Sequence, residues 1–173
     1  VGMATLMEIR PNTRVIEVGH ICYNPTLQRT ALATEAMYLL ARYIFEQLGY
    51  RRYEWKCNVL NAPSYRAAPR LGFTYEGLFR QATVVKGRNR DTAWFSILDG
   101  EWPVLKRAYE RWLDPGNFDR AGRQRQPLGA LMGGDVIEVA KEGAQAADSI
   151  VYENVIKMYS AMWNGGRKNA VWI

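Results

Sequence analysis

The segment Gln28-Arg29-Thr30-Ala31-Leu32-Ala33-Thr34 has the composition of a loop that binds a phosphate group. Its small side chains let the backbone approach a ligand, and a helical period begins at Leu32. The first turn of a helix has free main-chain N–H groups, which bind pyrophosphate with help from the helix dipole. A structural role fits equally well, with Thr30 or Thr34 capping the helix and the alanines favouring it.

Two other residue types could do chemistry. His20 is the only histidine, so a multi-histidine metal site or a histidine-based triad cannot be built within one chain. We expect His20 to be a packed strand residue. Cys57 lies in a strand-like segment with no general base nearby in sequence, which favours a small buried side chain.

Cysteine usage bears on the compartment. Cys22 and Cys57 are the only cysteines, and the sequence has neither a metal-type cysteine spacing nor a secretory apolar segment. We therefore expect no disulfide framework and a reducing, cytoplasmic environment. No stretch approaches the roughly 18 uninterrupted apolar residues of a membrane helix, so we expect no membrane partner.

The charge is unevenly distributed. Lys and Arg number 23 against 17 Asp and Glu, and residues 1–125 hold 19 of the basic and 12 of the acidic side chains. This excess predicts an anionic partner, either nucleic acid or a phosphorylated cofactor such as a coenzyme A thioester. Nucleic acid is the weaker candidate, because the aromatic residues at 50–65, beside Arg51 and Arg52, are more typical of a core and its rim than of a base-stacking platform.

Periodicity predicts an α/β domain with a mixed sheet. Period-two or β-rich segments predict strands at 4–9, 16–23, 50–59, 78–86 and 92–98. Helical periods predict helices at 32–48, 62–71 and 102–113. Gly49 should end the first helix, Pro69 should shorten or kink the second, and residues 87–90 should form the hairpin turn.

The C-terminal part differs in character. Residues 119–126 are polar and basic without periodicity, which predicts a linker. A Gly-rich apolar loop at 129–134, a strand at 136–140 and an amphipathic helix at 147–163 are expected to follow. The chain starts almost directly in a strand and ends on an apolar run, so both ends resemble cuts within a longer sequence.

Three segments in order carry a resemblance to a known family. Gln28 and Ala33 match a signature of Gln or Arg, two residues, Gly, one residue, then Gly or Ala. Ala31 replaces the central Gly, which is compatible with the signature where no positive φ is needed. The second segment comprises Asn61-Ala62-Pro63-Ser64, Arg66-Ala67-Ala68 and Leu71-Gly72-Phe73, and the third comprises Gly77, Phe79-Arg80, 86–89, Asp91, 94–98 and Glu101-Trp102. Together they resemble the GCN5-related N-acetyltransferases (GNAT), in particular the ribosomal-protein N-terminal acetyltransferase branch.

This resemblance covers about residues 1–118. It implies a mixed, mostly antiparallel sheet with flanking helices, in which the family's N-terminal elements are missing. It also implies transfer of an acetyl group from acetyl-CoA to an amine or to a protein or peptide N-terminus. The partners would be acetyl-CoA and that acceptor, with a homo-oligomer left open.

The resemblance further implies roles for individual residues. The loop Gln28, Arg29, Thr30, Ala31, Leu32, Ala33 and Thr34 would hold the coenzyme A pyrophosphate, and the main chain of Ile21, Cys22 and Tyr23 would contact the pantetheine arm. Asn61 would touch the same arm. Ser64 would protonate the leaving thiolate, or else cap a helix. Glu17 would be the general base acting through a water, or else a surface or paired glutamate.

A second, unrelated resemblance lies at the C-terminus. Residues 127–173 look like an internal stretch of tailed-phage major capsid proteins, through Pro127-Leu128-Gly129, 138–142, Gln145-Ala146-Ala147, Asn154, Lys157-Met158 and 167–173. The sequence thus predicts a partial acetyltransferase domain at 1–118, a linker at 119–126 and a capsid-like segment at 127–173. The alternative to an enzyme is a non-catalytic, truncated or chimeric protein that keeps a cofactor-binding fold or an assembly segment.

Overall fold

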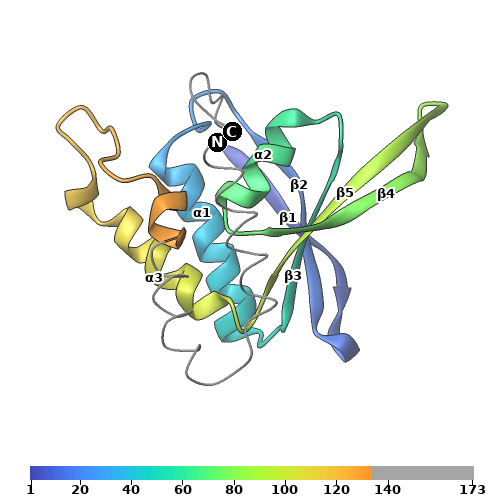
Figure 1. Cartoon of the computed structure of the whole chain (residues 1–173), viewed down its shortest axis with the longest axis horizontal. Helices are drawn as coiled ribbons and strands as arrows, with labels where there is room; N and C mark the ends of the chain where they lie inside the picture. Colours follow the sequence, from blue (N-terminus) through green and yellow to red (C-terminus); the bar gives the residue numbers. More distant parts are fainter. Residues whose placement is uncertain (134–173) are drawn as a thin grey trace. The chain divides into compact units, whose positions relative to one another are not determined.

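The computed structural model describes residues 1–133, which include a five-stranded sheet in the order β1-β2-β3-β5-β4 (Figure 1). The strands are β1 (Gly2–Arg10), β2 (Val15–Tyr23), β3 (Arg52–Asn58), β4 (Thr74–Val85) and β5 (Arg88–Leu98). Only β2 and β3 pair in parallel, and the other three pairs are antiparallel. The expected mixed, mostly antiparallel sheet is therefore confirmed.

Three α-helices accompany the sheet within these residues: α1 (Ala31–Arg42), α2 (Ala62–Arg70) and α3 (Trp102–Leu113). Helix α1 continues into a π-helical turn at Tyr43–Gln47, and Gly49 follows with a φ of +66°. Gly49 thus ends the helix as predicted, because a left-handed residue costs little there. Helix α2 ends one residue after Pro69, so the missing N–H falls in its last turn.

The described chain divides into two compact units, one of residues Val1–Lys106 and one that begins at Arg107. In the first unit, Tyr53, Trp55 and Cys57 of β3 are buried. The rings of Tyr53 and Trp55 pack against Phe73, and Phe45 after α1 meets Tyr53 edge-on. The alternate residues of β3 carry charges, so this strand has one apolar and one ionic face.

The hairpin between β4 and β5 differs from the predicted one. Its turn is Lys86-Gly87, with φ of +50° and +73°, and Val85 pairs with Arg88. Two positive φ values at the centre of a two-residue connection indicate a type I′ turn, which suits the twist of the flanking strands. The expected four-residue turn at 87–90 was wrong, and both strands extend beyond the rest of the sheet (Figure 1).

The prediction of a packed His20 was also wrong. His20 is exposed, with a φ of +49°, and its Nδ1 lies 3.1 Å from the Thr5 hydroxyl. Along β1 and β2, Thr5 pairs with Gly19 but Met3 pairs with Cys22, so β2 has one extra residue there. This β-bulge interrupts the alternation from which burial was inferred.

In the second unit, residues 119–126 contain no helix but are tied by hydrogen bonds. The Asp119 carboxylate accepts from the main-chain N–H groups of Ala121 and Arg123, at 2.8 and 2.9 Å. Hydrogen bonds from Arg123 hold the pKa of Asp119 below its usual value. The segment is thus a folded loop in the described structure.

The loop expected at 129–134 is helical at residues 128–133, and this expectation was wrong. The Pro127 carbonyl accepts from the N–H groups of Ala130 and Leu131, which starts the turn. Leu128, Leu131 and Met132 are buried, and this helical spacing of apolar side chains outweighs the low helix propensity of glycine. The strand predicted at 136–140 and the helix at 147–163 lie outside the described residues, and the capsid-like segment stays a prediction.

None of the helices within residues 1–133 has the length and apolar character needed to cross a membrane.

Candidate functional site

Strands β2 and β3 form a fork. Their parallel pairing runs from Val15–Arg52 to Val18–Trp55 and then stops, although β2 continues to Tyr23 and β3 to Asn58. Beyond Val18, the edge of β2 that faces β3 has main-chain groups without a partner on that strand. The bulge at His20 lies at this point and explains the divergence, since bulges bend a strand and increase its twist. The fork offers main-chain donors and acceptors to an extended ligand.

The loop after β2 ends in the N-terminus of α1. Thr30 is the N-cap, with its hydroxyl accepting from the Ala33 N–H at 3.2 Å and donating to the Leu27 carbonyl at 2.7 Å. The main-chain N–H groups of Ala31 and Leu32 form no hydrogen bond within residues 1–133. The capping interpretation is therefore confirmed for Thr30, and two donors at the positive end of the helix dipole still remain for an anion.

The replacement of the central signature Gly by Ala31 fits this backbone. Ala31 is the first residue of α1, and the left-handed residue of the loop is Arg29, with a φ of +63°. The Gln28 side chain donates to the Tyr23 carbonyl at 2.9 Å, which ties the loop to the end of β2. The side chains of Ala33 and Thr34 are buried, so within the first turn Leu32, at 65% exposure, is the position that faces solvent.

Asn61 and Ser64 lie together at the start of α2. Asn61 is the N-cap, and its side-chain oxygen accepts from the Ser64 N–H at 3.3 Å. Ser64 therefore does not cap this helix. Its hydroxyl oxygen instead accepts from the Trp55 indole Nε1 at 3.0 Å. Burial raises the pKa of the Cys57 thiol, while a hydrogen bond with Ser64 and the charge of Arg90 act in the opposite direction.

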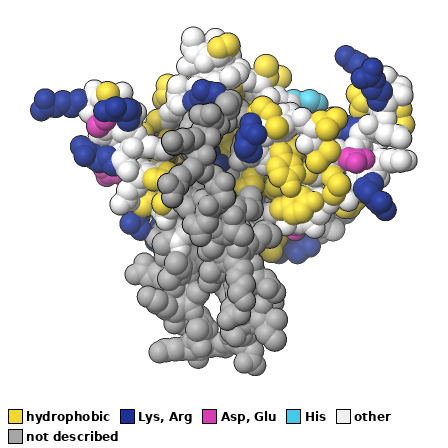
Figure 2. Space-filling model, turned by 45° about the horizontal axis from the view of Figure 1, so that its top comes forward, with side chains coloured by type: hydrophobic (Ala, Val, Ile, Leu, Met, Phe, Trp, Pro, Cys, Tyr) yellow, Lys and Arg dark blue, Asp and Glu magenta, His cyan; other side chains and the backbone are white. Residues whose placement is uncertain are grey.

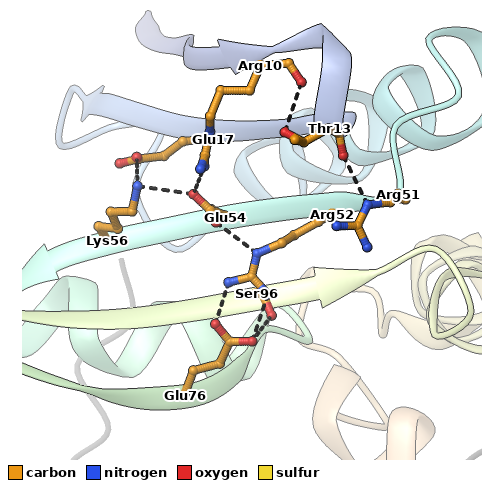
Figure 3. Close-up of polar contacts among 9 residues, drawn as sticks. All are labelled: Arg10, Thr13, Glu17, Arg51, Arg52, Glu54, Lys56, Glu76 and Ser96. Atoms are coloured by element: carbon orange, nitrogen blue, oxygen red, sulfur yellow. Dashed lines mark hydrogen bonds and ion pairs between the residues drawn. The ribbon is translucent and has the colours of Figure 1, made fainter.

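Glu17 lies on the other face of the sheet and is paired. It is buried, and its Oε2 accepts from Lys56 Nζ at 2.6 Å (Figure 3). The same ammonium lies 3.1 Å from Glu54 Oε2 and 4.0 Å from the centre of the Trp94 ring. Glu17 is thus a paired glutamate, one of the two alternatives that the sequence left open, and its role as a base stays a prediction.

Further ion pairs continue across β3 (Figure 3). Glu54 Oε2 also accepts from Arg10 at 2.6 Å, and Glu54 Oε1 accepts from Arg52 at 2.8 Å. Burial opposes the ionisation of Glu54, but the hydrogen bonds from Arg52 and Lys56 outweigh it and hold its pKa below the usual value. Arg52 then makes a two-pronged contact with Glu76, and this contact lowers the pKa of Glu76.

Glu17 and Ser64 both lie near the fork, on opposite faces of the sheet. Glu17 is paired opposite Glu54 one residue before the fork opens, on the ionic face. Ser64 contacts Trp55, the last residue of β3 that pairs with β2, on the apolar face. A ligand that passes between the diverging strands would therefore have the Ser64 hydroxyl on one side and the Glu17 carboxylate on the other.

Sequence reasoning missed Trp55 and Lys56 as parts of this site. From the sequence, Trp55 was placed among core residues as part of the aromatic cluster at 50–65, and Lys56 was given no role. Trp55 contacts Ser64, 9 residues away, and Lys56 contacts Glu17, 39 residues away. Both contacts depend on how β3 lies against α2 and β2, which no local sequence pattern encodes. Within residues 1–133, no group of three or more His, Cys, Asp or Glu side chains could hold a metal ion.

Comparisons with known proteins agree with this geometry. Residues 1–74 match the family model described as an acetyltransferase (GNAT) domain. Two Bacillus subtilis (strain 168) proteins are each 30% identical to this chain: the uncharacterized N-acetyltransferase YnaD, over 86 residues, and YdaF, provisionally named a ribosomal N-acetyltransferase, over 101 residues. The aligned part is 50% of this chain and 50% of YnaD, and 58% of this chain and 55% of YdaF, so the chain spans about half the length of these relatives.

A solved structure gives the same result. The crystal structure of a GCN5-related N-acetyltransferase from Brucella melitensis is 56% identical, with a TM-score of 0.75. The match covers 76% of this chain and 59% of that protein.

Proposed function

Because this chain belongs to the GNAT acetyltransferase family over the residues that it shares with these relatives, we propose that it transfers an acetyl group from acetyl-CoA to an amine. The proposal rests on the fork between β2 and β3 and on the loop that follows it, which ends at the main-chain N–H groups of Ala31 and Leu32, both free within residues 1–133. An extended thioester with a pyrophosphate at one end matches that combination of an open strand edge and an anion site.

The residues present fit acetyl-CoA. The loop 28–34 would hold the pyrophosphate, and the main chain of residues 21–23 would bind the pantetheine amides. Asn61 uses its side-chain oxygen as a helix cap, so its amide nitrogen, which has no partner within residues 1–133, is available to donate to the same arm. Acetyl-CoA supplies the acetyl group as a reactive thioester. The protein positions this thioester and protonates its sulfur as the sulfur leaves.

The proton transfers are assigned to the two sides of the fork. On the ionic face, the Glu17 carboxylate takes a proton from the acceptor ammonium through a water, which leaves a neutral amine to attack the acetyl carbon. On the apolar face, the Ser64 hydroxyl gives a proton to the sulfur as the carbon–sulfur bond breaks. The acceptor is an amine or a peptide N-terminus, and the provisional name of YdaF favours the peptide.

Binding and turnover test the proposal together. At a coenzyme A concentration ten times its Kd, a ligand that binds only the folded state adds about 1.4 kcal/mol and should raise Tm by a few degrees. Thermal melts measure this shift, and a panel of amines and peptide N-termini with acetyl-CoA measures turnover. A shift without turnover would favour the non-catalytic alternative, and no shift at millimolar coenzyme A would contradict the cofactor site.

Glu17→Gln should show a loss that depends on pH. The amide keeps an oxygen for Lys56 but cannot take a proton, so kcat at pH 7 should fall about 100-fold, the lower end of what a general base contributes. The ratio of wild-type to variant kcat should fall toward one at high pH, because the acceptor amine is already neutral there. pH profiles of both proteins measure this, with Glu8→Gln, on the exposed part of β1, as a control. A ratio that is constant with pH would assign Glu17 a structural role.

The location and the partners of the protein also belong to the proposal. Cys22 and Cys57 are both free thiols, which supports a reducing cytoplasmic environment. In the uncovered part of the face shown in Figure 2, Lys and Arg side chains lie in several separate places, among uncharged side chains and some Asp and Glu side chains. The binding of one cofactor anion needs no larger basic surface, so we propose no nucleic-acid partner.

A further inference from the structure

We infer that Trp55 is a positioning residue for Ser64, and that it directs the serine proton toward the fork. This inference rests on the proposed acetyl transfer. The indole Nε1 of Trp55 donates to Ser64 Oγ at 3.0 Å, and the two residues lie nine positions apart in the sequence. The hydrogen bond joins the strand at the fork to the first turn of α2.

Both partners are held by rigid elements. Trp55 is 4% exposed, its ring packs edge-on against Phe73 at 5.5 Å, and its main chain is the last of β3 to pair with β2. Ser64 is fixed from the other side, because the Asn61 cap accepts from its N–H. The distance between indole and hydroxyl is therefore set by the sheet and the helix cap rather than by a mobile side chain.

The donor character of the two groups fixes the direction of the bond. An indole N–H only donates, whereas a hydroxyl has one proton and two acceptor lone pairs. Ser64 must therefore accept from Trp55, and its own proton cannot point there. Ser64 also interacts with the Cys57 thiol, which is a weak hydrogen-bonding group and competes poorly with an anion. The Ser64 proton is thus available to a thiolate.

This arrangement suits the departure of the thiol. The acceptor nitrogen forms a bond to the acetyl carbon, the carbon–sulfur electron pair passes to sulfur, and Ser64 gives its proton to that sulfur. Glu17 has already taken the first proton of the ammonium, and the nitrogen loses a second proton to solvent as the amide forms. The hydroxyl regains a proton from solvent, so neutral amine and thioester become amide and thiol. The Trp55 N–H stabilises the negative charge that grows on Ser64 Oγ during this transfer.

Trp55→Phe tests the inference, with Trp102→Phe as the matched control. Both indoles are 4% exposed and both donate one hydrogen bond, that of Trp102 going to Glu46 Oε1 at 2.9 Å. Trp55→Phe should lower kcat about tenfold with an unchanged KM for acetyl-CoA, because it removes an interaction that matters only as sulfur departs. Trp102→Phe should leave kcat within twofold of wild type.

A double-mutant cycle separates positioning from packing. If Trp55 acts through Ser64, Trp55→Phe should change kcat less than twofold in a Ser64→Ala background. The same tenfold loss in both backgrounds would refute the inference and leave acetyl transfer standing. A wild-type protein that binds coenzyme A but turns over no amine would refute the proposed function and, with it, the role of Trp55.

Nuclear magnetic resonance gives a measurement that does not depend on the folding of Trp55→Phe. In Ser64→Ala, the indole N–H resonance of Trp55 should move upfield as its acceptor disappears, while that of Trp102 should stay in place. An unchanged Trp55 resonance would show that the hydrogen bond does not exist in solution and would overturn the inference.

Discussion

Replacing Ser64 with alanine is expected to lower kcat by about 100-fold or more while the Kd of acetyl-CoA stays the same. The hydroxyl is proposed to act only when negative charge develops on sulfur, so its removal should not affect the bound ground state. The helix should remain intact, because Asn61 rather than Ser64 caps α2. Steady-state kinetics and equilibrium binding of acetyl-CoA measure the two effects separately.

Asn61→Asp provides the contrast. Aspartate keeps the cap, since its carboxylate accepts from the Ser64 N–H as the amide oxygen does, but it loses the amide donor. The KM for acetyl-CoA should therefore rise while kcat changes little, because that contact is the same in the ground and transition states. If Ser64→Ala instead raised KM and left kcat unchanged, Ser64 would be a binding residue rather than an acid.

Leu32→Asp is expected to weaken coenzyme A binding about 10- to 100-fold, or roughly 1.4–2.8 kcal/mol, because the repulsion between two charges about 4 Å apart lies between about 1 kcal/mol in water and about 4 kcal/mol near a protein surface. Leu32 is 65% exposed and lies in the turn whose N–H groups are proposed to bind pyrophosphate. The substitution should not harm folding, because an acidic side chain in the first turn of a helix interacts favourably with the dipole. Isothermal titration with coenzyme A, together with thermal melts of the unliganded protein, measures both properties.

Leu39→Asp is the control for this effect. It adds the same charge to the same helix at a 42% exposed position about two turns away. Its coenzyme A affinity should match that of the wild type, since screening by salt weakens exposed charges at about 10 Å. Equal losses in both variants would indicate a general effect of charge, and full binding by Leu32→Asp would move the anion site elsewhere.

The elements that the sequence predicted well are those with local signals. Helix α3 occupies the predicted residues because its amphipathic period is bounded by Pro115 and Gly116. The hairpin turn begins one residue earlier than predicted, because Lys86 takes a left-handed conformation that is not expected from a lysine. His20 was misplaced for a similar reason, since the extra residue of a bulge is visible only once two strands are paired.

The candidate site likewise has a part that the sequence predicted and a part that it did not. The loop 28–34 is a local feature, and its cap and free N–H groups follow from a strand end that leads into a helix start. The partners of Glu17 and Ser64 could not be predicted, because Lys56 and Trp55 reach them across the sheet or from the sheet to α2. In the sequence, Trp55 and Lys56 look like ordinary strand residues. Their contacts become visible only when the positions of β2 and α2 beside β3 are known.

The bulge in β2 has a consequence for redesign. Residues 15–18 are all buried, whereas residues 19–23 alternate between partly and fully exposed positions, and the extra residue at His20 shifts the second stretch by one place. The strand therefore consists of two short blocks that are out of phase. Packing can be altered in the first block without changing which side chains the second presents, but an insertion or deletion between them would exchange the two faces of everything that follows.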